Sequence, residues 1–393
     1  MAFAVARSVR DAVPSALVPV STGAAPDGPA RADWVAFKRR YLAGDGRVID
    51  TGNGGISHSE GQSYGMLLAT WMDDRPAFEA MWRWSNRRLR RAADNLLAWR
   101  YDPHARRGVT DQNNATDGDL IFAWALQRGA LRWDSAEMAE AGFAVAQDLL
   151  SLCTAGYVDR HVLLPGTAGF RQADHVVLNP SYYAFNAFRS LSRLVPDNRW
   201  LQLEAGGIDI LGASRFGRWG LPPDWTEVKS NGDISPANAW PPRFSWDAVR
   251  VPLHVAWAGL DLPVLQAAVT FWTAPGLPHS PPAWVDLRSG AMAPYPGHAG
   301  IRAVVNLAAW RSGRAGPPPR IPLTAASDYY GASLIMLAAM AASEGPEPPA
   351  LPAAVTAPPS GGGVLNRVMS FLGLESEEAE AAEAARTAAR RMR

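Results

Sequence analysis

A polar loop that leads into a strongly apolar run with helical spacing occurs five times along the chain, and this recurrence constrains the fold more than any other feature. Each loop places an acidic or aromatic residue at the start of the run, at Glu60, Asp117, Tyr182, Asp247 and Tyr329. The separations are 57, 65, 65 and 82 residues, about the length of one helical hairpin with its loops. Between them lie amphipathic segments, with little of the alternation typical of strands. The pattern predicts an all-α ring of helical hairpins with the apolar helices inside.

In such a ring every inner helix starts at the same end, so the loops before these helices line one groove. We therefore expect the three acidic markers Glu60, Asp117 and Asp247 to lie close together. Glycoside hydrolysis needs such a set: a protonated carboxyl group donates to the leaving oxygen, and a carboxylate activates water or attacks carbon. Sixteen Trp residues are many for this length; most are expected in the core, and any beyond the needs of the core would suit a groove for sugar rings. No nucleophile elbow, P-loop or dinucleotide-binding motif competes.

The segment of residues 47–68, RVIDTGNGGISHSEGQSYGMLL, shows how one marker is presented. Ser59, with Gln62 three residues on, forms a capping-box pattern, which predicts that Ser59 caps the helix. Glu60 then lies in the first turn, where the helix dipole favours a carboxylate. This segment alone leaves two interpretations open, a capping charge and a proton-transfer group beside His58.

Composition excludes several classes of function. The formal net charge of the 393 residues is +1, which gives no electrostatic reason to expect binding to nucleic acid. The single cysteine, Cys153, cannot form an internal disulfide and lies in an apolar run. The seven His residues show no metal-ligand spacing, so we expect neither a metal nor another cofactor.

The chain divides into three parts by composition. Residues 1–30 form a leader or flexible arm, rich in Ala, Pro and Gly, that is a poor match to a secretion signal. Residues 31–344 hold the recurring pattern and are expected to be the catalytic domain. Residues 345–393 contain a Pro- and Gly-rich linker, a short apolar piece, VLNRVMSFLGL, and a charged tail. The apolar piece is a candidate for docking to a partner.

Three segments resemble a known family. The sequences HSEGQSYGMLLA at 58–69, ATDGDLIFAWAL at 115–126 and FSWDAVRVPL at 244–253 are similar to the signature segments of glycoside hydrolase family 8. The resemblance covers about 34–342 and is greatest to the endoglucanases of bacterial cellulose-synthesis operons. It implies an (α/α)6 barrel and an inverting endo-β-1,4-glucanase that binds a β-glucan chain. It further implies a monomer, a periplasmic or secreted location and a cellulose synthase complex as partner.

The resemblance also implies roles for individual residues. Glu60 matches the general acid, Asp247 the general base, and Asp117 the residue that holds the sugar at the point of cleavage. A general acid should be enclosed by apolar groups that raise its pKa, whereas Arg250 should keep Asp247 ionised. Asp119 is expected to be structural. The residues implied to bind substrate are Trp99, Trp246, Arg250, Tyr182 or Tyr183, and Tyr329 or Tyr330, and the sequence leaves open which tyrosine of each pair contacts the sugar.

Two other functions remain open at this point. A glycanase of the same fold could act on xylan, chitosan or mixed-linkage glucan. A non-catalytic polysaccharide-binding protein would have no need for both Glu60 and Asp247, and is therefore the weaker alternative.

Overall fold

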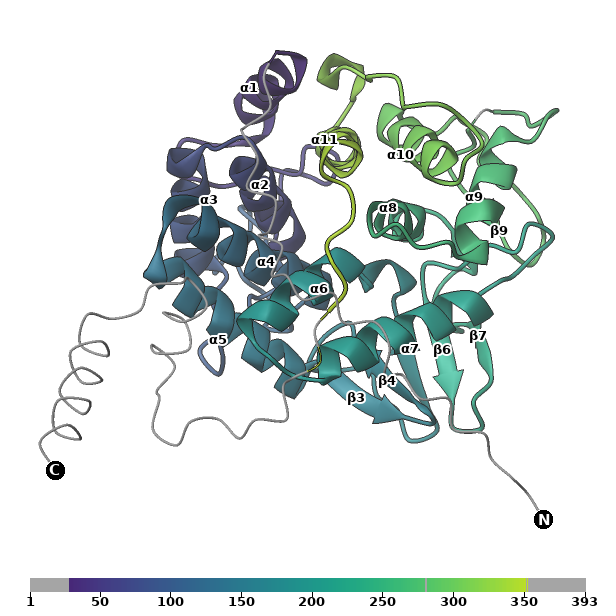
Figure 1. Cartoon of the computed structure of the whole chain (residues 1–393), viewed down its shortest axis with the longest axis horizontal. Helices are drawn as coiled ribbons and strands as arrows, with labels where there is room; N and C mark the ends of the chain where they lie inside the picture. The colour runs from purple at the N-terminus through teal and green to yellow at the C-terminus, as the bar shows by residue number, and fades with distance from the viewer. Residues whose placement is uncertain (1–27, 280, 351, 353–393) are drawn as a thin grey trace, which may run out of the picture.

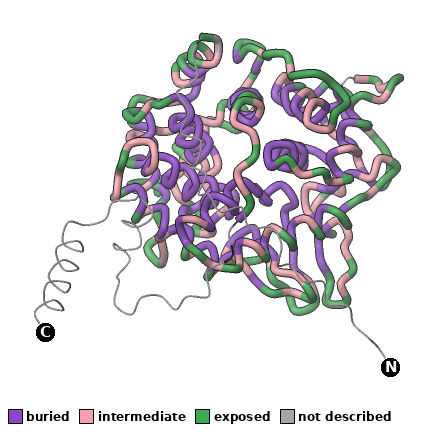
Figure 2. Tube along the Cα trace, viewed as in Figure 1, coloured by how far each residue is buried: buried purple, intermediate pink, exposed green. Residues whose placement is uncertain are grey.

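Six apolar helices form the inner layer of the molecule (Figure 1). The computed structural model describes residues 28–279, 281–350 and 352. The inner helices are α2 (Ser59–Trp71), α4 (Thr116–Trp133), α6 (Phe185–Leu194), α8 (Arg250–Trp257), α10 (Ala299–Arg311) and α11 (Tyr329–Glu344). Figure 2 shows that most of their length is buried. The predicted ring of helical hairpins, an (α/α)6 barrel, is confirmed.

The outer layer consists of amphipathic helices that precede the inner ones in the chain. They are α1 (Pro29–Tyr41), α3 (Arg75–Arg88), α5 (Ala136–Leu152), α7 (Arg199–Ala213) and α9 (Pro263–Thr273). Helix α3 illustrates the pattern, because Phe78 and Met81 are fully buried while Arg83 and Arg87 on the other face are exposed. The carboxylate of Asp74 caps this helix by accepting a hydrogen bond from the Ala77 N–H at 3.2 Å.

The sixth hairpin departs from the other five. Helix α10 packs against α8, α9 and α11 and is mostly buried, so it takes the remaining inner position. Its cap is His298, which is neither acidic nor a tyrosine, and the marker pattern therefore missed this helix. The outer partner of α11 is reduced to the 3-10 turn η2 (Leu323–Ala325). Residues 317–319 before it are all proline, and proline has no N–H to continue a helix.

Short strands, which the sequence did not predict, brace the loops at the cleft end. The strands are β1 (Ser57–His58), β2 (Arg100–Tyr101), β3 (Thr154–Tyr157), β4 (Arg160–Leu163), β5 (His175–Leu178), β6 (Thr226–Lys229), β7 (Ile234–Pro236), β8 (Arg243–Phe244) and β9 (Val285–Asp286). They form the antiparallel sheets β1-β2, β3-β4, β5-β6-β7 and β8-β9. The three-stranded sheet ends next to the 3-10 turn η1 (Pro180–Tyr182), which carries one of the predicted site tyrosines. With two to four residues each, the strands are too short for a clear alternation of polar and apolar residues.

The first part of the predicted C-terminal linker contacts the barrel. Beyond the end of α11, the carboxylate of Glu347 pairs with Arg193 of α6 at 2.5 Å. The backbone N–H of Glu347 donates to the Asn186 side chain at 3.1 Å, and Ala350 is buried. Residues 345–350 therefore belong to the folded domain. The remainder of the predicted linker and tail, apart from residue 352, lies outside the described residues, as do residues 1–27 of the predicted leader.

Among the described residues, no helix combines the length and the apolar character needed to cross a membrane.

Candidate active site

A cleft of about 510 Å³ lies at the end of the barrel where the inner helices begin. It is lined by residues from the starts of α2, α4, α8 and α11 and from the loops between them. Glu60, Asp117 and Asp247, the three acidic markers of the sequence, all line it. Their helices are far apart in the chain and meet only because the inner helices are parallel.

Arg250 joins the three carboxylates. Its guanidinium group donates through Nη1 to Glu60 and, at 2.8 Å, to Asp117, while Nη2 donates to Asp247 at 2.6 Å. The arginine side chain is only 2% exposed. The sequence had related Arg250 to Asp247 alone, one helical turn away. In the structure this arginine is the shared partner of all three acidic groups.

Burial shifts the ionisation of two of these carboxyl groups. Burial raises the pKa of Asp117 to about 6; the positive charge of Arg250 opposes this shift, and the negative charge of Glu60 adds to it. Burial also raises the pKa of Asp247, where the opposing effect of Arg250 is outweighed. Arg250 thus lowers the pKa of Asp247, as expected from the sequence, but the net shift is upward because the effect of burial is larger.

His58, not Ser59, caps the helix that carries Glu60. The imidazole Nδ1 of His58 accepts the Gly61 N–H at 3.0 Å, and α2 begins at Ser59, one residue earlier than a Ser59 cap would require. The predicted capping box is absent because the side chain of Gln62 points into the protein, where it accepts a hydrogen bond from the Val48 N–H. The imidazole is held in turn by Asp50, with 3.3 Å between Nε2 and Oδ2.

The surroundings of Glu60 are charged, whereas the sequence analysis expected apolar ones. Its carboxylate contacts Arg250, and Nδ1 of His58 lies 3.9 Å away. Helix α4 approaches it closely because Gly118 has no side chain. A Cβ atom at Gly118 would overlap the Ser59 hydroxyl and the backbone of Glu60. This glycine of the TDGD segment therefore lets Asp117 and Glu60 share one guanidinium.

Each of the two tyrosine pairs divides between the cleft and the core. Tyr182 and Tyr330 line the cleft, and the Tyr330 hydroxyl donates to the backbone carbonyl of Trp246 at 2.5 Å. Tyr183, the other candidate of its pair, is 1% exposed, and its hydroxyl accepts the Leu163 N–H at 3.2 Å. Tyr329, the other candidate of the second pair, is fully buried and packs edge-on against Tyr41.

Two tryptophans stand at the cleft surface, as expected for a groove that holds sugar rings. Trp99 donates through Nε1 to Asp111 at 2.8 Å, which fixes the plane of its indole. Trp246 is 50% exposed and stacks on His298, with ring centroids 5.5 Å apart and planes 10° apart. A planar indole held in this way offers one face to an apolar sugar surface.

Two further buried carboxyl groups support the site from behind. Asp119 accepts hydrogen bonds from the Leu97 N–H at 2.8 Å and from the Asn114 amide at 2.9 Å, so it ties a cleft loop to α4, in keeping with its expected structural role. Asp224 accepts hydrogen bonds from the backbone N–H groups of Ser245 and Ala248 on either side of Asp247. Asp224 could not be found from the sequence, because it lies more than 20 residues away in a loop without a motif. Asp50, Asn53 and Asp328 also line the cleft and were not predicted.

The fold and the carboxylate-lined cleft define a glycoside hydrolase. Residues 8–344 match the family described as Glycosyl hydrolases family 8, and the chain belongs to this family. The resemblance found in the three signature segments is thereby confirmed.

The chain is similar over most of its length to proteins named as endoglucanases. A probable endoglucanase of Novacetimonas hansenii is 43% identical over 86% of this chain and 98% of its own length. The solved structure of the endo-β-1,4-glucanase CMCax from Acetobacter xylinum is 41% identical, with a TM-score of 0.75, over 80% of this chain and 98% of that one. The family 8 endoglucanase Cel10 from Klebsiella pneumoniae is 37% identical, with a TM-score of 0.74, over 80% and 99%.

Proposed function

We propose that this chain is an endo-β-1,4-glucanase that cleaves internal bonds of a cellulose-like chain with inversion of configuration. The observation that carries the proposal is the meeting of Glu60, in the first turn of α2, and Asp247, in the turn before α8, on one buried guanidinium in an aromatic-lined cleft. The similarity to endo-β-1,4-glucanases over most of the chain supports the choice of substrate.

In the proposed reaction Glu60 gives its proton to the glycosidic oxygen as the bond from this oxygen to the anomeric carbon breaks. Asp247 takes a proton from a water molecule whose oxygen forms the new bond to the opposite face of that carbon. Asp117 and Tyr182, which line the cleft between these groups, would hold the sugar at the point of cleavage.

A guanidinium ion favours the ionised form of a neighbouring carboxyl group, whereas a general acid must carry a proton, so Arg250 has to move away from Glu60 in the proposed reaction. Asp117 and Asp247 remain as partners for the guanidinium group, so the move would leave no buried charge unpaired. We infer that entry of the sugar chain separates Arg250 from Glu60.

The test is hydrolysis of carboxymethylcellulose beside xylan, chitosan and mixed-linkage glucan, with the anomeric configuration of fresh products followed by NMR. We expect turnover of carboxymethylcellulose and inverted products. Glu60→Gln should abolish hydrolysis and leave oligosaccharide binding within about three-fold, because the amide keeps the shape but has no acidic proton. Retained configuration would contradict the mechanism, and preference for another polysaccharide would contradict the substrate. Binding without turnover by the unaltered chain would favour a polysaccharide-binding protein.

We further propose that the protein works as a monomer, outside the cytoplasm, beside a cellulose synthase complex. The support is the sequence resemblance to endoglucanases of cellulose-synthesis operons. Cell fractionation tests the location, and co-purification with the synthase tests the partner. Recovery of the full-length chain in the cytoplasmic fraction alone would contradict both.

A further inference from the structure

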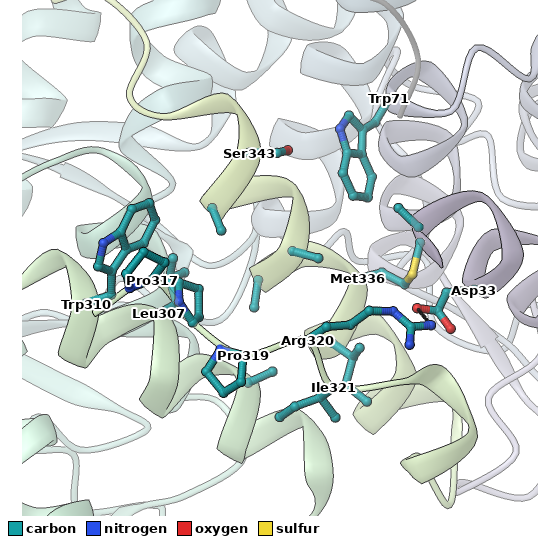
Figure 3. Close-up of a pocket in the computed structure, with 17 residues that line it drawn as sticks. Asp33, Trp71, Leu307, Trp310, Pro317, Pro319, Arg320, Ile321, Met336 and Ser343 are labelled. Carbon is teal, nitrogen blue, oxygen red and sulfur yellow. Dashed lines mark hydrogen bonds and ion pairs between the residues drawn. The ribbon is translucent and has the colours of Figure 1, made fainter. Parts of the chain in front are cut away.

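An apolar groove lies on the outer surface of the barrel, away from the cleft. Its volume is about 360 Å³, and it is bordered by α1, α10, α11 and the proline-rich segment before η2. Figure 3 shows Trp71, Leu307, Trp310 and Met336 arranged around it. Alanines of α11, among them Ala339, form its floor, and Ala339 is exposed.

The groove is the place of the missing sixth outer helix. Each of the other five hairpins contributes an outer helix to the layer around the barrel, whereas α11 has only residues 312–328 with the turn η2. The side chains that α11 presents here are small at Ala338, Ala339 and Ala342. Small side chains allow a second helix to pack at short distance.

We propose that residues 364–374 of this same chain, VLNRVMSFLGL, dock in this groove and complete the outer layer. Leu365, Val368, Met369 and Leu372 follow the i, i+3, i+4, i+7 spacing of one apolar helix face. As a helix these 11 residues would be about 16 Å long. The α11 segment that lines the groove, residues 335–343, is about 14 Å long, so the two lengths match.

The tether between the barrel and this segment is long enough. The described chain leaves α11 at Gly345, and residues 345–352 can carry it at most about 28 Å away. Residues 353–363 span up to about 36 Å when extended, which covers the return to the groove. A tether of this kind gives an effective concentration on the order of millimolar, so a modest apolar contact suffices.

Charge favours the same occupant. Arg320 lines the groove and pairs with Asp33 at 2.8 Å, and Arg311 follows the lining residue Trp310 in the chain. The run that directly follows the proposed segment, residues 375–383, contains five glutamates and no basic residue. The matched family region ends at residue 344, so this segment is an addition to the family fold.

A disulfide-trapping experiment on the full chain tests the proposal. Cys153, the one natural cysteine, is buried and does not interfere. Ala339→Cys places a thiol on the groove floor, and Met369→Cys places one on the apolar face of the segment. Ser370→Cys is the matched control, since it has the same tether length but points away from the apolar face. We expect the Ala339/Met369 pair to close at least about ten-fold faster than the control pair, at a rate independent of protein concentration.

A second measurement does not depend on disulfide geometry. It compares the Ala339→Cys variant with a variant that also carries Leu365→Asp and Met369→Asp. Because burying carboxylates is unfavourable, the aspartates should expel the segment from the groove and speed maleimide labelling of the thiol at position 339 at least about five-fold. Turnover of carboxymethylcellulose should be unchanged. Equal rates of disulfide formation in the two cysteine pairs would overturn the proposal. An equal rate of maleimide labelling with and without the aspartates would also overturn it. Disulfides between chains that increase with concentration would assign the groove to a second copy instead.

Discussion

Asp224 accepts a hydrogen bond from the backbone N–H of Ala248 at 2.8 Å, across 24 residues of sequence. The same carboxylate accepts the Ser245 N–H at 3.0 Å and the Ser245 hydroxyl. Asp247 lies between these two residues, so Asp224 fixes the turn that aims Asp247 into the cleft. It is a positioning residue for the proposed general base.

Asp224→Ala should lower kcat roughly 10- to 100-fold with little change in KM, because a base misplaced by a fraction of an ångström reacts poorly while the binding surface is intact. Asp224→Asn keeps one acceptor oxygen for the turn and should lose less activity. Steady-state kinetics on cellohexaose would measure both. A rise in KM with unchanged kcat would show that Asp224 shapes the cleft instead of the base.

The acidic side of the pH profile should lie well above the ordinary range of aspartate. Burial raises the pKa of Asp117 to about 6 and also raises that of Asp247, which must be ionised to act as a base. Activity on uncharged oligosaccharides should therefore begin to fall at a pH above the ordinary range of aspartate, as Asp247 becomes protonated. Because the negative charge of Asp117 raises the pKa of Asp247, Asp117→Asn should move this limb to lower pH. If the acidic limb of the pH–activity profile is the same in Asp117→Asn, the charge of Asp117 does not affect the ionisation of Asp247.

The two halves of a tyrosine pair should behave in opposite ways. Tyr182→Phe should lower kcat/KM and leave thermal stability nearly unchanged, because its hydroxyl faces the cleft. Tyr183→Phe should leave kcat/KM nearly unchanged but cost about 1–3 kcal/mol of stability, since the buried Leu163 N–H loses its acceptor. Steady-state kinetics of both variants measure kcat/KM, and urea unfolding measures their stability. If the Tyr183→Phe variant folds but loses activity, Tyr183 contacts the substrate and the assignment to the core is wrong.

Residues 345–350, which follow α11 and contact the barrel, should contribute to the stability of the fold. Glu347→Ala leaves the guanidinium of Arg193, 12% exposed, without its carboxylate, and should cost about 2–4 kcal/mol in the free energy of unfolding. Glu79→Ala is the matched control, because the pairs of Glu79 with Arg75 and Arg83 are largely exposed and should matter by less than about 1 kcal/mol. Equal effects in urea unfolding would show that residues 345–350 do not brace the barrel.

The sequence could predict the ring and the three carboxylates because both depend on local patterns. Long apolar runs at regular spacing can be buried only as inner helices, and residues before parallel inner helices must meet at one end. Glu60, Asp117 and Asp247 could thus be assigned to one cleft before any distance was known. The segment 301–310 was predicted as a helix but was not counted among the inner ones, because His298 stands where the other inner helices have an acidic or aromatic marker.

Sequence by itself determined the helical hairpins, where the polar loops lie and which acidic groups they carry. Tertiary structure alone decided which tyrosine of each pair faces the cleft, that His58 caps α2, and that Arg250 serves three carboxylates. These outcomes depend on the rotation of each helix and on partners more than 100 residues away, such as Glu60 for Arg250. A side chain's role in such a site is set by the distance and burial of its neighbours, and only the packed barrel fixes both.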